Sequence, residues 1–296
     1  MQNPKENKIL KFVNDEIFKS VLSSPDCLES LCLLISETCN VDYNDLLLNI
    51  RYSNTELQIR RYNEKVKRSD LILETDNKIF IIEMNRGHYY NGLFVKNYSY
   101  ANEVNLSCIK KGMKYSESKD IYLINIDEFD SFKCNSLVVD FPRYNKENNV
   151  LERINIHDKH VILENIYKDN YTKYSDTFIR LIKIMITDEE DKLQNLSKGV
   201  DILENIVNKL IDLSSDEDMI GLYDLEERRL MELNSMRDYE RKQGLSEGHE
   251  QGHKQGLSEG SKKTQNSIAK NLLKLGMKIE EISKATGLSI NQIKML

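Results

Sequence analysis

Asp70 and Glu83 are the residues of this sequence best placed to do chemistry together. They lie within the stretch SDLILETDNKIFIIEMN, residues 69–85, in which two short apolar runs surround Asp76-Asn77. Apolar runs separated by turn-forming residues predict a β-hairpin. If the strands pair symmetrically about the turn, Asp70 lies opposite Glu83, with their Cβ atoms roughly 4.5–5.5 Å apart.

Two carboxylates at that separation repel each other unless one takes up a proton or a cation bridges them. Oxygen ligands favour a hard cation, so we expect Asp70 and Glu83 to bind Mg²⁺ or Mn²⁺. Asn85 lies two residues beyond Glu83 and therefore points to the same face. The alternative is a surface hairpin with two solvated acids, and a loop of odd length would turn Glu83 to the other face.

The order of these residues resembles the PD-(D/E)xK nuclease superfamily, in which an Asp on one strand is followed by Glu-x-Lys on the next. More narrowly, the sequence resembles the recombination-promoting nuclease (Rpn) family, also described as PD-(D/E)xK transposases. The resemblance covers roughly residues 10–245. The matching features are Asp15, Phe18-Lys19, Asp70, Ile82-Glu83-Met84-Asn85, Tyr98, Gly112, Tyr115 and a strand at 121–126.

The resemblance implies an α/β fold with a restriction-endonuclease-like core, in which helices flank a mixed sheet, followed by a helical C-terminal extension. It also implies a metal-dependent DNA endonuclease that acts in recombination, transposition or defence against foreign DNA. On that pattern Asp70, Glu83 and Asn85 are catalytic, and Asp15 is an accessory acid. The superfamily has Lys, and the Rpn family usually Gln, where this chain has Asn85. An asparagine can orient water but cannot act as a cation.

Composition and charge restrict the class of protein. The chain has 296 residues, of which 40% are hydrophobic and 30% charged, and no apolar run approaches the ~20 residues of a membrane helix. The N-terminus shows no apolar signal segment. The five cysteines show no CxxC pairing, which favours a reducing cytoplasm over a zinc site. We therefore expect a soluble, cytoplasmic protein.

A net charge of -6 does not predict nucleic-acid binding, so contact with DNA requires a local basic patch. Residues 60–68 form such a patch directly before Asp70, and Arg86 follows the second acidic residue closely. A solvated basic turn is the alternative. The cations expected to contact phosphates are Arg60, Arg61, Lys65, Lys67, Arg68 and Arg86.

Apolar spacing predicts the elements that must position these residues. We expect helices over 5–22, from Ser24-Pro25 onward and from Leu93. We expect a first strand within 45–62, with Leu46–Ile50 and Leu57–Ile59 as its candidates, and further strands over 120–126 and 136–141. From residue 150 the pattern turns helical, with segments near 161–168, 173–187 and 199–213. Asp188 to Asp191 form an acidic cluster that is typical of a helix N-terminus.

The C-terminal part changes character, and we divide the chain into 1–215, 216–263 and 264–296. Residues 216–242 predict a charged helix. Glycines then recur every fourth residue, at Gly244, Gly248, Gly252, Gly256 and Gly260. This repeat favours self-association of two helices, with a flexible tether as the alternative. Residues 264–296 predict a small helix-turn-helix module for assembly or docking, or for weak contact with DNA.

Two functions of different kinds fit this sequence. The first is a metal-dependent DNA endonuclease with Asp70 and Glu83 as its metal ligands. The second is a non-catalytic nucleic-acid binder that self-assembles through the C-terminal tail, which the uncharged Asn85 and the acidic net charge favour. RNA is a third possible substrate, although no RNA-specific pattern occurs.

Overall fold

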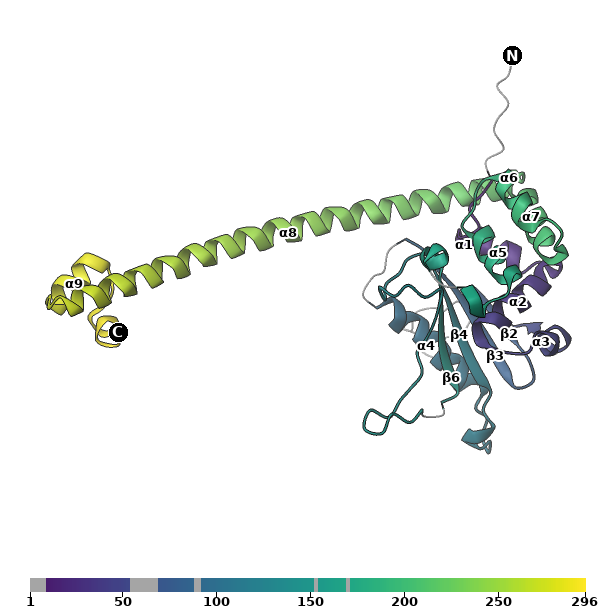
Figure 1. Ribbon diagram of the computed structural model, residues 1–296, viewed down its shortest axis with the longest axis horizontal. Coiled ribbons are helices and arrows are strands. Elements are labelled where there is room, and N and C mark those ends of the chain that lie inside the picture. Colours follow the sequence, from purple (N-terminus) through teal and green to yellow (C-terminus); the bar gives the residue numbers. More distant parts are fainter. Residues whose placement is uncertain (1–8, 54–68, 88–91, 152–153, 169–170) are drawn as a thin grey trace, which may run out of the picture. The chain divides into compact units, whose positions relative to one another are not determined.

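The computed structural model describes residues 9–53, 69–87, 92–151, 154–168 and 171–296 of the chain (Figure 1). These residues fall into two compact units, Met1–Leu230 and Met231–Leu296. The first unit holds the sheet and most of the helices. The second consists of helices only.

The first unit is built on a mixed six-stranded sheet in the order β1-β2-β3-β4-β6-β5. The three central strands β3, β4 and β6 are parallel, and the outer strands pair with them or with each other in antiparallel fashion. The strands are β1 (Arg51–Tyr52), β2 (Leu71–Glu74), β3 (Lys78–Asn85), β4 (Asp120–Asp127), β5 (Val138–Asp140) and β6 (Ile156–Ile162).

Helices cover both faces of this sheet (Figure 1). α4 packs on one face through Ala101 and Val104, which contact alternate residues of β3 and β4 such as Ile81 and Leu123. The larger core lies on the other face, against the remaining helices of this unit. The helices of the unit are α1 (Asp15–Leu22), α2 (Leu28–Cys39), α3 (Tyr43–Asn49), α4 (Leu93–Cys108), α5 (Asp176–Met185), α6 (Glu190–Ser197) and α7 (Asp201–Ser214), with short 3-10 turns at Pro25–Cys27, Tyr115–Glu117, Leu163–Tyr167 and Tyr171–Lys173.

The predicted hairpin is confirmed, together with its register. Leu71 pairs with Ile82, and the Thr75 N–H donates to the Lys78 carbonyl at 2.9 Å. The loop therefore has even length. Extended one residue beyond the last pair, this register sets Asp70, which directly precedes β2, opposite Glu83. Strand β3 is buried along almost its whole length, as expected for a strand covered on both faces.

Three expected elements differ in the structure. Residues 46–49, one candidate for the first strand, belong to α3, whose start is capped by the Asp42 side chain accepting from the Asp45 N–H at 2.7 Å. The other candidate, Leu57–Ile59, lies outside the described residues, and β1 at Arg51–Tyr52 falls within the expected range. Of the helix expected over 5–22, residues 9–14 are not helical and α1 begins at Asp15, while residues 5–8 lie outside the described residues. Strand β6 lies where only helices were expected, because the polar run His157 to His160 conceals its strand pattern.

Other predicted elements are confirmed. Helix α4 and strands β4 and β5 lie where the apolar spacing placed them, and α6 begins within the acidic cluster, at Glu190. Helix α8 (Glu217–Lys274) is longer than the predicted charged helix, since it continues through the whole glycine repeat for 58 residues.

The C-terminal module is a helix-turn-helix in the predicted place. It comprises the end of α8, α9 (Ile279–Thr286) and α10 (Ile290–Lys294). Gly287 ends α9 with a φ of 74°, and Ser289 caps α10 in a reciprocal pair of hydrogen bonds with Gln292. A small core of Ala269, Ile282, Leu288 and Ile293 holds it together. No helix among the described residues is long and apolar enough to span a membrane.

Candidate active site

Asp70 and Glu83, which we call the carboxylate pair, lie at the end of the hairpin. Glu83 is on the α4 face of β3, because its neighbours in the pleat, Ile82 and Met84, belong to the core on the opposite face. This end of β3 is also its carboxyl end, beside the carboxyl ends of the parallel strands β4 and β6. Ligands of α/β sheets commonly bind at that edge.

Glu83 is a buried carboxylate with an incomplete set of partners. Its side chain is 3% exposed, and Oε2 lies 3.5 Å from Nζ of Lys96 on α4. Its other oxygen, Oε1, is buried and has no hydrogen-bond partner. Burial, followed by the nearby charge of Asp70, raises the pKa of Glu83 from 4.5 to about 7. This carboxyl is therefore poised to gain a proton or a cation.

Asp70 has partners on both of its oxygens. Oδ1 forms an ion pair with Nζ of Lys19 on α1 at 3.0 Å, and Oδ2 accepts from the Met84 N–H at 2.8 Å. Each member of the carboxylate pair thus contacts a lysine of its own, one on α1 and one on α4. The two lysines partly compensate the negative charge of the pair.

The carboxylate pair offers oxygen ligands of the kind that Mg²⁺ prefers. Oε1 of Glu83 is a buried acceptor without a hydrogen-bond donor, and a cation there would satisfy it. Mg²⁺ commonly takes only one or two carboxylates from the protein and completes its shell with water and substrate phosphates. Among the described residues no group of three or more His, Cys, Asp and Glu side chains converges on one point. The residues therefore fit a two-carboxylate site rather than a closed protein cage.

Asp15, the expected accessory acid, lies close to the carboxylate pair. Burial, followed by the charges of Asp70 and Glu226, raises the pKa of Asp15 from 3.8 to about 7. Its backbone N–H donates to Oε1 of Glu226, a residue of α8, at 3.3 Å. The start of α1 thus joins the same acidic region.

The expected DNA contact of Arg86 requires correction. Its guanidinium is only 8% exposed and donates to Oε1 of Glu226 at 2.8 Å and to Oε1 of Glu227 at 2.6 Å. Those two carboxylates fill the positions that a phosphate would need. The other expected cations, Arg60, Arg61, Lys65, Lys67 and Arg68, lie outside the described residues.

Asn85 is placed in a buried polar network rather than open to solvent. Its Nδ2 donates to Oδ1 of Asp127 at 2.7 Å and to Oδ1 of Asn125 at 3.5 Å. Its Oδ1 accepts from Nδ2 of Asn97 on α4 at 3.2 Å. Asn97 Nδ2 also donates to Oδ1 of Asn125 at 2.7 Å. The side chain of Asn85 is therefore hydrogen-bonded both to α4 and to β4.

The network continues to His160 on β6. Nδ1 of His160 lies 2.6 Å from Oδ2 of Asp127, and Nε2 lies 3.3 Å from Oδ1 of Asp158. Burial alone would lower the pKa of His160, but the hydrogen bonds to the two aspartates outweigh it and raise that pKa from 6.5 to about 9. We call these six residues, Asn85, Asn97, Asn125, Asp127, Asp158 and His160, the histidine network.

Sequence reasoning found Asn85 and missed the other five members of the histidine network. Asn125 and Asp127 end a strand that was correctly predicted, and they alternate with apolar residues, so their shared face was available as a signal. His160 and Asp158 were hidden because β6 was not recognised. Asn97 lies on the predicted helix α4, where its burial depends on tertiary packing.

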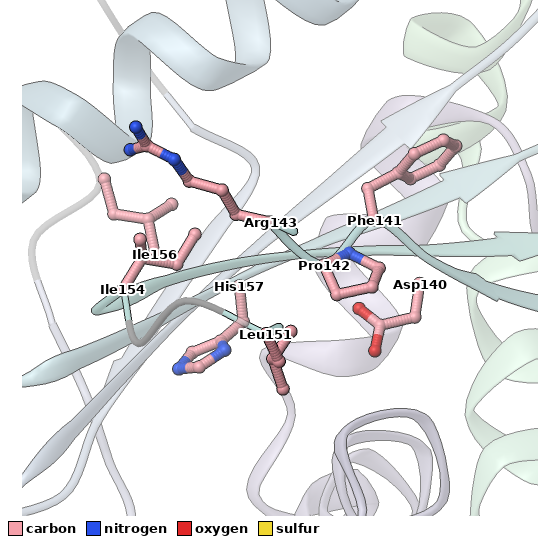
Figure 2. Close-up of a pocket in the computed structure, with 8 residues that line it drawn as sticks. All are labelled: Asp140, Phe141, Pro142, Arg143, Leu151, Ile154, Ile156 and His157. Carbon is pink, nitrogen blue, oxygen red and sulfur yellow. The ribbon is translucent and has the colours of Figure 1, made fainter. Parts of the chain in front are cut away.

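A separate pocket of about 270 Å³ lies at the β5 edge of the sheet (Figure 2). Phe141 and Arg143 extend to one side of the chain there, and Asp140 and His157 extend to the other. Asp140 forms an ion pair with Lys159 at 2.8 Å, and His157 stacks on Tyr122 at 4.6 Å. None of the residues expected to be catalytic lines this pocket.

Comparisons of the chain with protein-family models, with curated proteins and with solved structures found no match. The function is therefore inferred from the chemistry of the site.

Proposed function

We propose that the protein is a metal-dependent DNA endonuclease with a nuclease-like core, and that the carboxylate pair is its catalytic centre. The observation that carries the proposal is the buried Oε1 of Glu83, an acceptor with no donor, opposite Asp70 across a hairpin of the required register. A buried carboxyl with a strongly raised pKa at the carboxyl ends of parallel strands is typical of a functional site.

Asp70 and Glu83 would hold Mg²⁺ or Mn²⁺, which would polarise the scissile phosphate and lower the pKa of an attacking water. Asn85 orients that water through its side-chain amide. Asp15, with a pKa near neutrality, is placed to exchange a proton at the edge of the site.

Lys96 supplies the positive charge that Asn85 lacks. It lies on α4, its Nζ is 3.5 Å from Oε2 of Glu83, and its side chain is 40% exposed. If a metal cation took over the pairing with Glu83, a lysine with that reach could pair with a phosphate oxygen and thereby stabilise charge that develops in the transition state. Lys19 holds Asp70 from the opposite side.

Nicking of supercoiled plasmid in the presence of Mg²⁺ tests the proposal. Wild type should convert the plasmid to open circles, whereas Asp70→Ala should not. Asp76→Asn is the matched control, because this acid lies at the turn of the same hairpin and its side chain is 90% exposed. Equal nicking by wild type and Asp70→Ala would remove the assignment.

A non-catalytic nucleic-acid binder is the second candidate. The observation that favours it is that Lys19 and Lys96 already pair with the two carboxylates, so the fold does not need an ion to compensate them. This candidate predicts DNA binding that does not depend on Mg²⁺, with no cleavage of supercoiled, linear or single-stranded substrates.

A further inference from the structure

The side-chain amide of Asn85 has a fixed orientation. Both hydrogens of its Nδ2 have acceptors, Asp127 at 2.7 Å and Asn125 at 3.5 Å, and its Oδ1 accepts from Asn97 at 3.2 Å. Rotating the amide by half a turn would set its oxygen against the Asp127 carboxylate and its NH₂ against the NH₂ of Asn97. Both of those contacts are repulsive, so one orientation is imposed.

Asp127 imposes this orientation because it is itself held in place. It is completely buried on β4 and uses one oxygen for each neighbour, Oδ1 for Asn85 and Oδ2 for His160. The imidazole of His160 is fixed in turn at Nε2, 3.3 Å from Asp158, and lies edge-on to Phe94, Phe132 and Phe141 with ring centroids 4.9–5.4 Å away.

We propose that Asp127 and His160 are positioning residues that make Asn85 a hydrogen-bond acceptor toward the reacting water. This inference rests on the proposed function. Since Asp127 and Asn125 take both hydrogens of Asn85, the residue offers only an oxygen lone pair to whatever binds beside Glu83. Asn85 therefore orients water by accepting from it, and it donates nothing to the phosphate.

Exchanging the two side chains tests this geometry. In the double variant Asn85→Asp with Asp127→Asn, the amide at position 127 can still accept from His160 and now donates to the carboxylate at position 85. The residue at 85 thus remains an acceptor. Asn85→Asp alone sets two buried carboxylates against each other, and Asp127→Asn alone removes the anion that faces His160.

We expect each single variant to lower the melting temperature by about 10 °C and kcat by about tenfold or more, with little change in the affinity for DNA measured in Ca²⁺. The double variant should recover part of both losses, because the carboxylate at position 85 regains a donor at position 127 but still faces Oδ1 of Asn125. Losses that simply add in the double variant would overturn the inference. Asn105→Asp is the matched control, because Asn105 Oδ1 already accepts, from Asn155 at 2.7 Å, and should tolerate the carboxylate.

The two proposals fail in different ways. The melting temperatures of the four proteins are measured without substrate or metal. If they show no recovery while wild type nicks DNA, the positioning role is wrong and the endonuclease stands. If the melting temperatures recover but wild type nicks nothing, the endonuclease is wrong, and the role of Asn85 toward a reacting water falls with it.

Discussion

The carboxylate pair and the histidine network are two polar groups on the same sheet, at the same edge, with opposite designs. In the histidine network Asn85, Asp127 and His160 are joined by short hydrogen bonds and are almost fully buried. In the carboxylate pair, Glu83 is equally buried but keeps one oxygen without a partner. The first arrangement stabilises the fold, whereas the second costs stability.

This difference separates a supporting role from a reactive one. Asp127 and His160, at the centre of the histidine network, have partners on all of their side-chain polar atoms, whereas Oδ1 of Asn97 at its edge has none. A satisfied buried centre of this kind rigidifies the strands that carry it. A buried acceptor without a donor persists only where the surrounding structure enforces it, and such groups gather at functional sites. We therefore expect mutation of the carboxylate pair to raise the free energy of unfolding and mutation of the histidine network to lower it.

The largest effect is expected from neutralising Glu83. Glu83→Gln should reduce Mg²⁺-dependent nicking by about 10³-fold, because the variant loses a metal-binding charge. It should also raise the free energy of unfolding at pH 8, because a buried, poorly satisfied charge is removed. Kinetics and urea unfolding measure the two effects. Glu74→Gln on the neighbouring strand, where the side chain is 29% exposed, is the control and should leave nicking unchanged. A loss of stability in Glu83→Gln would contradict the contrast between the two groups.

Breaking the histidine network should destabilise the protein instead. His160→Ala leaves the buried Asp127 and the partly buried Asp158 without their cation, and should lower the free energy of unfolding by about 3–5 kcal/mol at pH 7. His157→Ala, three residues earlier on β6, removes a partly exposed imidazole and should cost about 1 kcal/mol. Urea titrations of the two variants measure both free energies of unfolding. Equal decreases in the two variants would show that the histidine network contributes no more stability than a partly exposed histidine.

The pH dependence of stability distinguishes the two groups. The pKa of Glu83 is raised on folding, so its protonated form favours the folded state, and stability falls by about 3 kcal/mol as pH rises from 4.5 to about 7. The pKa of His160 is also raised, so its contribution is complete below pH 6.5 and is lost as pH rises through about 9. A plot of the free energy of unfolding against pH should therefore be flatter than that of wild type between pH 4.5 and 7 in Glu83→Gln. In His160→Gln it should be flatter between pH 6.5 and 9. Unchanged slopes in the two variants would refute the respective assignments.

The smallest effect is expected in the glycine repeat of α8. Around Gly252 and Gly256 an added Cβ would meet no atom within 4 Å in the single chain. Each Gly→Ala change should therefore favour the helix by about 1 kcal/mol. If the glycines allow two α8 helices to approach closely, the same changes should weaken self-association, as light scattering can measure. A more helical variant with an unchanged oligomeric state would remove the role predicted for the repeat.

The carboxylate pair was predictable from the sequence, whereas most of its surroundings were not. The turn residues Asp76 and Asn77 fix the hairpin register, and that register alone places Asp70 opposite Glu83. The partners of the pair come from distant helices, Lys19 from α1 and Lys96 from α4, and no local pattern determines which lysine reaches which acid.

The histidine network shows why the remainder was missed. Strand β6 reads IHDKHVI, in which four consecutive polar residues break the apolar pattern of a buried strand. His160 can be buried in the sheet because it pairs with Asp127 on the adjacent strand, and the parallel register of β4 and β6 brings these two residues together. Arg86 was misjudged for a similar reason, since its partners Glu226 and Glu227 lie 140 and 141 residues away.

Crystals soaked in Mn²⁺ at pH 8 would test the central claim most directly. The account predicts an anomalous density peak between the carboxyl groups of Asp70 and Glu83, with Oε1 of Glu83 among the ligands, and its loss in Glu83→Gln. A carboxylate pair that keeps Lys19 and Lys96 in place and shows no peak at saturating Mn²⁺ would contradict it.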